Sequence, residues 1–243
     1  MAAARVRSTV LSEWGFGRTV GRGLTQAALL SGPSGTGKSM TAEAIAQALD
    51  RPLLRADVAG LLSKYVGETS KRIDAVFERA RTHRAVLLFD EADALFARRV
   101  SVRSSTDRYA NTETAALLDA LGRHDGVVVL TTNLVDEIDA AFDRRLQLRL
   151  TYERPDVPAR AAIWRRMLPS EAPLAADVDP LRLARGFDLS GGQIRNAVLA
   201  AALEAASAKL GERRITHAML ERAARLQLPP AAGVTVLRAE PSC

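Results

Sequence analysis

The sequence has almost no cysteine, few aromatic residues and no long apolar run. Its single cysteine, Cys243, is the last residue, so an intrachain disulfide cannot form and a reducing compartment is favoured. No apolar stretch approaches the ~18 residues that a membrane helix needs, and the N-terminal residues lack the hydrophobic block of a signal peptide. We therefore expect a cytoplasmic protein that does not enter a membrane.

The scarcity of aromatic residues also bears on nucleic-acid binding. Aromatic side chains stack on the bases of single-stranded nucleic acids, and they make up only 5% of this chain. A net charge of +6 would suit such a partner, but the basic residues are scattered among 28 acidic ones and form no long run. A nucleic-acid partner is therefore not expected, and the basic residues are interpreted as a solvated surface.

The distribution of apolar residues indicates a globular α/β protein. An apolar fraction of 47% is ordinary for a folded domain, and 243 residues suffice for a core and a smaller attached unit. Strand-length apolar runs occur at residues 27–30, 53–56, 85–89, 127–130 and 146–150. Helical periodicity separates several of them, at residues 39–49, 70–81 and 112–121. This alternation predicts a five-stranded parallel sheet.

The remainder of the chain carries only helical patterns. They cover residues 159–167, 181–184, 193–208 and 216–226, after prolines at 155 and 158. We therefore predict an α/β core over residues 24–154 and a small all-α lid over 155–228. Residues 1–23 are interpreted as an N-terminal linker and 229–243, which lack periodicity, as a flexible tail.

A glycine-rich turn joins the first predicted strand to a helix. Its residues are Gly32, Pro33, Ser34, Gly35, Thr36, Gly37, Lys38 and Ser39, followed by Met40. This is the P-loop pattern, in which backbone N–H groups and a helix N-terminus surround phosphate oxygens. Lys38 is expected to reach the β- and γ-phosphates, and the Ser39 hydroxyl to ligate Mg²⁺. We predict that ATP and Mg²⁺ bind here, with Met40 among the contacting residues.

Acidic and amide residues follow two other buried strands. Asp90 and Glu91 come directly after the run at 85–89, and ligands of open parallel sheets bind beyond such strand ends. Asp90 is therefore a candidate magnesium ligand and Glu91 a candidate base that activates water. Asp93 is interpreted as part of a helix N-cap. Asn133 follows the run at 127–130, where it either bonds the γ-phosphate or attacking water, or merely forms a turn.

In this order, the motifs GPSGTGKS, LLFDEAD, TTN and IDAAFDRRL resemble the AAA+ ATPases, over roughly residues 24–225. The resemblance implies a P-loop NTPase core with a helical lid, ATP hydrolysis, and assembly into a homo-oligomeric ring, usually a hexamer. The segment at 107–113 is similar to bacterial AAA proteins that accompany contractile injection systems. Tyr65, Val66 and Gly67 resemble the pore loop that grips a protein substrate, although Tyr65 could instead be a half-buried packing residue.

The same resemblance assigns three further roles. Asn133 corresponds to the sensor 1 residue, and Arg144 and Arg145 correspond to fingers that reach a neighbouring subunit's site. The two arginines are adjacent here, whereas the commonest family pattern separates them, so either one could act, or both form a plain surface pair. Gly192 and Arg195 resemble the sensor 2 region, although Arg195 could also be an exposed helix residue.

The resemblance favours a motor that remodels or threads proteins. Two alternatives stay open: a nucleic-acid-directed AAA+ ATPase such as a helicase loader, and a nucleotide switch that does not hydrolyse ATP. Family members normally carry a recognition domain before the P-loop, which the short leader cannot hold. The sequence leaves open whether such a domain is missing, and it names neither the substrate nor the pathway.

Overall fold

The computed structural model describes residues 9–19, 25–61, 68–93, 105–134, 142, 144–209, 211 and 213–229. By its internal contacts the chain divides into two units, residues 1–153 and 154–243. Each unit has apolar core clusters of its own. The first contains the sheet, and the second is built from helices.

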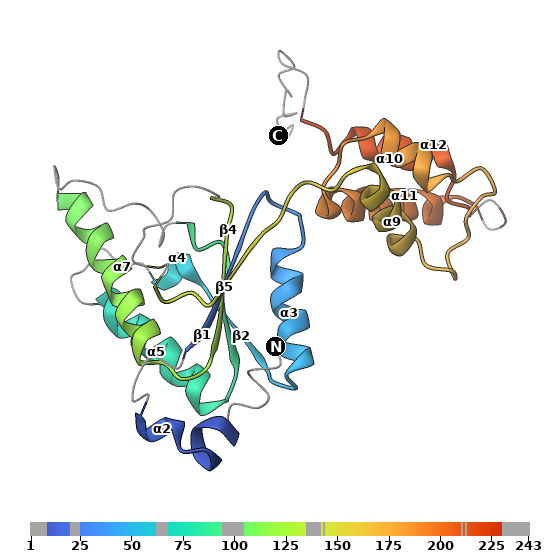
Figure 1. Ribbon diagram of the computed structural model, residues 1–243. Helices are drawn as coiled ribbons and strands as arrows, with labels where there is room; N and C mark the ends of the chain where they lie inside the picture. The colour runs from blue at the N-terminus through green and yellow to red at the C-terminus, as the bar shows by residue number, and fades with distance from the viewer. Residues whose placement is uncertain are drawn as a thin grey trace. The chain divides into compact units, whose positions relative to one another are not determined.

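The first unit is organised around a five-stranded, all-parallel sheet (Figure 1). Its strands are β1 (Gln26–Ser31), β2 (Leu53–Ala56), β3 (Val86–Phe89), β4 (Val127–Thr132) and β5 (Leu148–Thr151). Their order across the sheet is β2-β3-β4-β1-β5. The predicted parallel sheet is confirmed, and its strand order places β4 between β1 and β3.

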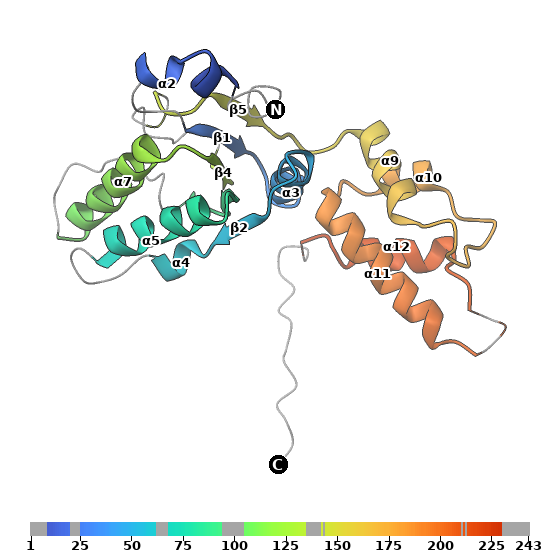
Figure 2. The same cartoon turned by 90° about the horizontal axis from the view of Figure 1, so that it is seen from below.

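Helices cover both faces of this sheet, which explains why the strands β1, β3 and β4 are almost entirely buried. Helix α3 (Lys38–Ala48) lies on one face, and α4 (Val58–Leu61), α5 (Glu68–Thr82) and α7 (Ser105–Arg123) lie on the other (Figures 1 and 2). Neighbouring residues of β1 divide accordingly: Leu30 packs with Ala42 of α3, and Leu29 belongs to the cluster that contains Phe77 of α5. Two short elements, η1 (Thr9–Glu13) and α2 (Phe16–Thr19), precede the sheet.

Helix α7 is longer than the sequence predicts. The apolar periodicity begins at residue 112, whereas the helix begins at Ser105. The stretch from 105 to 111 reads Ser-Thr-Asp-Arg-Tyr-Ala-Asn and carries no apolar stripe from which a helix could be recognised. Apolar periodicity marks only those helix residues that form an apolar stripe, so it does not predict residues 105–111 as helical.

The second unit packs its helices around a buried tryptophan, Trp164. The helices are α9 (Val157–Met167), α10 (Pro180–Gly186), α11 (Gly191–Ser207) and α12 (His217–Arg225). Each begins at a side chain that accepts a hydrogen bond from the first turn, and these capping residues are Asp156, Asp179, Ser190 and Thr216. Within the described ranges, no helix is both long enough and apolar enough to cross a bilayer.

Candidate functional site

The predicted phosphate loop lies between the end of β1 and the start of α3. Gly32, Gly35 and Gly37 adopt φ angles of 135°, 75° and 104°, which favour glycine over other residues. Helix α3 begins after Gly37, and no described side chain caps it, in contrast to the helices of the second unit. Its first-turn N–H groups therefore suit an anion such as phosphate.

The first glycine of the loop is held by its neighbours in the sheet. The N–H of Gly32 donates to the carbonyl oxygen of Thr132 at 3.2 Å, and Tyr152 lies on its other side. A Cβ at position 32 would lie 2.2 Å from the carbonyl oxygen of Tyr152. The Tyr152 hydroxyl in turn donates to Thr41 Oγ1 of α3 at 2.6 Å. Tyr152 therefore contacts both Gly32, at the start of the loop, and the first turns of the helix that follows it.

We expect Gly32→Ala to destabilise the nucleotide-free protein more than Gly37→Ala does. Both positions have a positive φ, which costs an alanine about 1–3 kcal/mol. Only position 32 adds a clash, since no described atom lies within 4 Å of a Cβ built at Gly37. The free energy of unfolding in urea measures the difference. An equal loss in the two variants would show that Tyr152 yields without cost.

Lys38 is held at the mouth of the loop by its side-chain ammonium. Nζ donates to the carbonyl oxygens of Gly32 at 2.6 Å and Pro33 at 2.9 Å, and to Asn133 Oδ1 at 3.0 Å. The residue is only 7% exposed. Burial lowers the pKa of the Lys38 ammonium, and the nearby carboxylates of Asp93, Asp90 and Glu91 oppose that shift. The buried Lys38 ammonium thus lies among three carboxylates.

Asp90 joins the P-loop to the neighbouring strands. Its Oδ1 accepts hydrogen bonds from Ser39 Oγ at 2.9 Å and from Thr131 Oγ1 at 2.5 Å. Its Oδ2 forms an ion pair with Arg55 of β2, at 2.6 Å from Nη2. The predicted magnesium ligands Ser39 and Asp90 are therefore adjacent, as a shared metal ion requires.

Glu91 stands next to this cluster with a constrained backbone. Its φ of 53° is uncommon for a residue with a side chain. Its N–H donates to Thr131 Oγ1 at 2.9 Å, and the N–H of Ala92 donates to the carbonyl oxygen of Thr131 at 2.8 Å. Residues that persist in such a conformation concentrate at functional sites. Glu91 is an exposed residue that water can reach.

Asn133 lies beyond the end of β4 and faces both the P-loop and Asp93. Its Nδ2 donates to Asp93 Oδ2 at 3.2 Å, and its backbone N–H donates to Asp93 Oδ1 at 2.8 Å. The Thr132 hydroxyl also donates to Asp93. The described hydrogen bonds of Asp93 run to the end of β4, and its predicted part in a helix cap stays a prediction, since the residues that follow it lie outside the described ranges. The partner Asn133 lies 40 residues away in the chain, which no local pattern indicates.

The chemistry of these residues fits a magnesium-bound nucleotide. Uncapped N–H groups of α3 and the ammonium of Lys38 match phosphate oxygens, and the oxygens of Ser39 and Asp90 match Mg²⁺. The sequence does not predict two residues that contact Asp90. Arg55 reads as an ordinary polar strand residue, and Thr131 as an apolar-strand ending, because their contacts depend on strand order.

The remaining predicted site residues fall elsewhere. Tyr65, Val66 and Gly67 lie outside the described residues. Arg144 is exposed, whereas Arg145 is half-buried, and its Nε lies 4.0 Å from a Cβ built at Gly122. Met40 is 63% exposed on α3.

Gly192 and Arg195 belong to helix α11 of the second unit. Ser190 and Gln193 cap that helix reciprocally, each side chain bonding the other's backbone N–H. Arg195 is exposed, with Nη2 3.5 Å from Asn196 Oδ1. This capping box gives the Ser-Gly-Gly-Gln segment a local structural role, and a contact of Gly192 or Arg195 with nucleotide stays a prediction.

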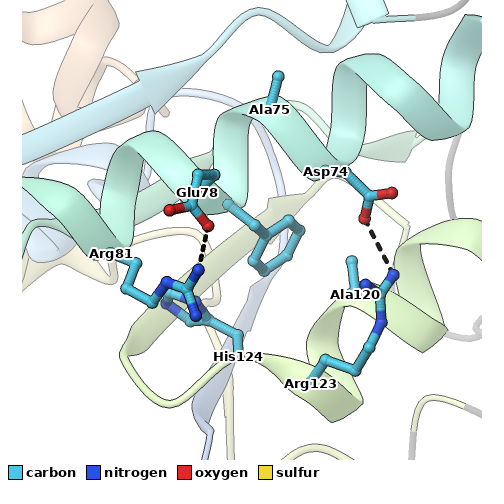
Figure 3. A pocket seen from close by; sticks show the side chains of 8 residues that line it. Asp74, Ala75, Glu78, Arg81, Ala120, Arg123 and His124 are labelled. Carbon is cyan, nitrogen blue, oxygen red and sulfur yellow. Dashed lines mark hydrogen bonds and ion pairs between the residues drawn. The ribbon is translucent and has the colours of Figure 1, made fainter.

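A separate hollow of about 410 Å³ lies between α5 and α7 (Figure 3). Opposite charges line it in pairs: Arg81 contacts Glu78, and Arg123 lies 2.9 Å from Asp74. His124 and Phe77 complete it with an edge-to-face contact at 5.2 Å between ring centroids. The hollow contains none of the residues predicted for nucleotide binding.

Comparison with known proteins gives two family matches. Residues 28–154 match the model of the ATPase family associated with various cellular activities (AAA). Residues 156–230 match the contractile injection system ATPase helical domain.

Individual relatives support the same assignment. The ATP-dependent zinc metalloprotease FtsH 3 of Sphaerobacter thermophilus is 36% identical over 85% of this chain and 43% of its own length. The ATP-dependent zinc metalloprotease YME1 homolog of Caenorhabditis elegans is 34% identical, over 86% of this chain and 29% of its own. Human vacuolar protein sorting-associated protein 4A is 36% identical, over 69% of this chain and 38% of its own length. The chain thus spans less than half the length of these relatives.

Proposed function

The chain belongs to the AAA family of ATPases and carries the helical domain of contractile injection system ATPases, and on that premise we propose that it hydrolyses ATP to remodel other proteins. One observation supports the hydrolysis above all. Lys38, Ser39, Asp90 and Asn133 come from three different parts of the chain and are joined by hydrogen bonds of 2.9 to 3.0 Å. Glu91 directly follows Asp90 in the sequence and is an exposed residue.

Each residue of this cluster has a role that its chemistry supports. Lys38 binds phosphate oxygens with its ammonium, and the N–H groups at the start of α3 bind them with the helix dipole. Ser39 and Asp90 would hold Mg²⁺, which supplies positive charge to the β- and γ-phosphates of bound ATP. Glu91 accepts the proton of a water molecule, and Asn133 orients the groups around it.

The proposal includes a homo-oligomeric ring, for which a hexamer is the usual family form. Arg144 is exposed and can therefore reach a second copy of this chain, where it would neutralise charge on the γ-phosphate. Gly192 and Arg195 of the second unit are proposed to contribute to nucleotide binding within the chain. Hydrolysis would then depend on assembly, because a monomer lacks the arginine supplied in trans.

The substrate is proposed to be a protein, gripped by Tyr65, Val66 and Gly67 in the ring pore. Two names among the relatives support a protein substrate, since the FtsH 3 and YME1 homolog proteins are proteases. The match at residues 156–230 supports a cellular role connected with a contractile injection system. A cytoplasmic location completes the proposal.

The experiment measures phosphate release by the purified chain, with Mg²⁺ and ATP, alone and with casein as an unfolded polypeptide. We expect hydrolysis that requires Mg²⁺, particles of ring size in the presence of ATP, and faster hydrolysis with casein. Tyr65→Ala should remove the stimulation by casein and spare basal hydrolysis. Tyr65→Phe keeps the aromatic side chain and should retain both activities. No phosphate release would contradict the ATPase, and equal stimulation of the Tyr65→Ala variant would contradict threading.

A further inference from the structure

The cluster contains a carboxylate that neither the phosphate loop nor the magnesium ligands require. Asp93 accepts hydrogen bonds from the Thr132 hydroxyl, from the backbone N–H of Asn133 at 2.8 Å, and from Asn133 Nδ2 at 3.2 Å. All three donors belong to the end of β4. Asp93 therefore holds one residue of the site by both its backbone and its side chain.

The opposite end of the Asn133 amide contacts a cation. Its Oδ1 accepts a hydrogen bond from Lys38 Nζ at 3.0 Å. A reversed amide would place its NH₂ group against the ammonium and its oxygen against the carboxylate of Asp93, so that both contacts would be repulsive. The two charged neighbours thus permit one orientation of the amide.

This orientation decides what Asn133 can do. Lys38 has three ammonium hydrogens and three described acceptors, of which Asn133 Oδ1 is the only side-chain one. We infer that Asp93 is a positioning residue, which turns Asn133 so that its oxygen accepts from Lys38 and one N–H of its NH₂ group donates to Asp93. Asn133 then acts as an acceptor that fixes the lysine. This inference rests on the proposed ATPase function.

Replacing Asp93 by asparagine tests it with almost no change in size. The new side chain can still accept from the Thr132 hydroxyl, but its NH₂ group would face that of Asn133, and the Asn133 amide is expected to reverse. Its NH₂ group would then oppose the Lys38 ammonium. We expect kcat to fall by about 10- to 100-fold, the range found for residues that orient a metal ligand through a hydrogen bond. Binding of a fluorescent ADP analogue should weaken much less, because the α3 N–H groups remain.

A matched control and an exchange variant make the test specific. Asp125→Asn is the same change at an exposed residue before β4, at the other end of the strand from Asn133, and should leave kcat unchanged. Asn133→Asp alone would place two carboxylates side by side. Combined with Asp93→Asn, it would restore every donor–acceptor pair. The melting temperature of the nucleotide-free double variant should therefore fall by less than the sum of the decreases in the two single variants.

The outcomes separate this inference from the proposed function. A wild-type protein that releases no phosphate would overturn the ATPase itself. A wild-type protein that hydrolyses ATP, with Asp93→Asn equal to it in kcat, would overturn only the positioning role. Additive melting temperatures in the exchange experiment would show that residues 93 and 133 do not act as a pair.

Discussion

Replacing Glu91 by glutamine should leave ATP bound but almost unhydrolysed, with kcat lowered by about 100- to 10,000-fold. Glutamine has nearly the same shape as glutamate but cannot accept a proton from water at neutral pH. The contacts that place the residue are made by its backbone and survive the change: its N–H donates to Thr131 Oγ1 at 2.9 Å. Single-turnover phosphate release measures the chemical step, and a fluorescent ATP analogue measures binding.

The control for this experiment is Glu43→Gln, the same chemical change at an exposed residue of α3. It should hydrolyse ATP at the wild-type rate. If Glu91→Gln lost ATP affinity and kcat in equal proportion, the side chain would be a binding residue. If it kept full activity, the base would have to be sought elsewhere.

Replacing Arg144 by alanine should lower kcat by about 1,000- to 100,000-fold, the range known for arginine fingers. Arg145→Ala should have a smaller effect on the chemical step. Arg145 is half-buried, and its backbone N–H donates to the carbonyl oxygen of Phe142 at 2.8 Å. Its side-chain Nε lies 4.0 Å from a Cβ built at Gly122. The exposed Arg144 is free to contact another subunit. Steady-state hydrolysis at a concentration that supports the ring compares the two variants.

Mixing two inactive variants tests whether Arg144 acts in trans. In a mixed ring, a subunit with Arg144→Ala retains Glu91, and a neighbour with Glu91→Gln can supply the missing arginine. Mixing should therefore restore part of the activity. A mixture of Glu91→Gln and Lys38→Ala should stay inactive, because each variant lacks a residue of its own site. Failure of the first mixture, or a larger loss in Arg145→Ala, would contradict the assignment to Arg144.

The elements that the sequence predicts best are those that depend on local pattern. Runs rich in apolar residues predicted all five strands to within a few residues. The signal is most continuous in β3 and β4, because a strand covered on both faces must be apolar along most of its length. The phosphate loop is equally local, because its glycines, lysine and helix start are contiguous. The polar start of α7 was missed, since nothing in residues 105–111 marks a buried face.

The contacts around Asp90 and Asn133 could not be predicted in the same way. The hydrogen bonds of Asp93 depend on a partner at the end of β4, and the ion pair of Arg55 with Asp90 depends on β2 lying beside β3. Likewise, an adjacent arginine pair looks symmetrical in the sequence. They differ in the structure, because Arg145 is half-buried and Arg144 is exposed.

The sequence alone determined that this protein has a phosphate loop, a strand ending in two acids, and a strand ending in an asparagine. The tertiary structure decided how these ends meet. Because β4 lies between β1 and β3 in a parallel sheet, its carboxyl end places Thr131 beside Asp90 and Asn133 beside Lys38. Strand order arises from packing across the whole sheet, so segments distant in the chain become neighbours that no local pattern records.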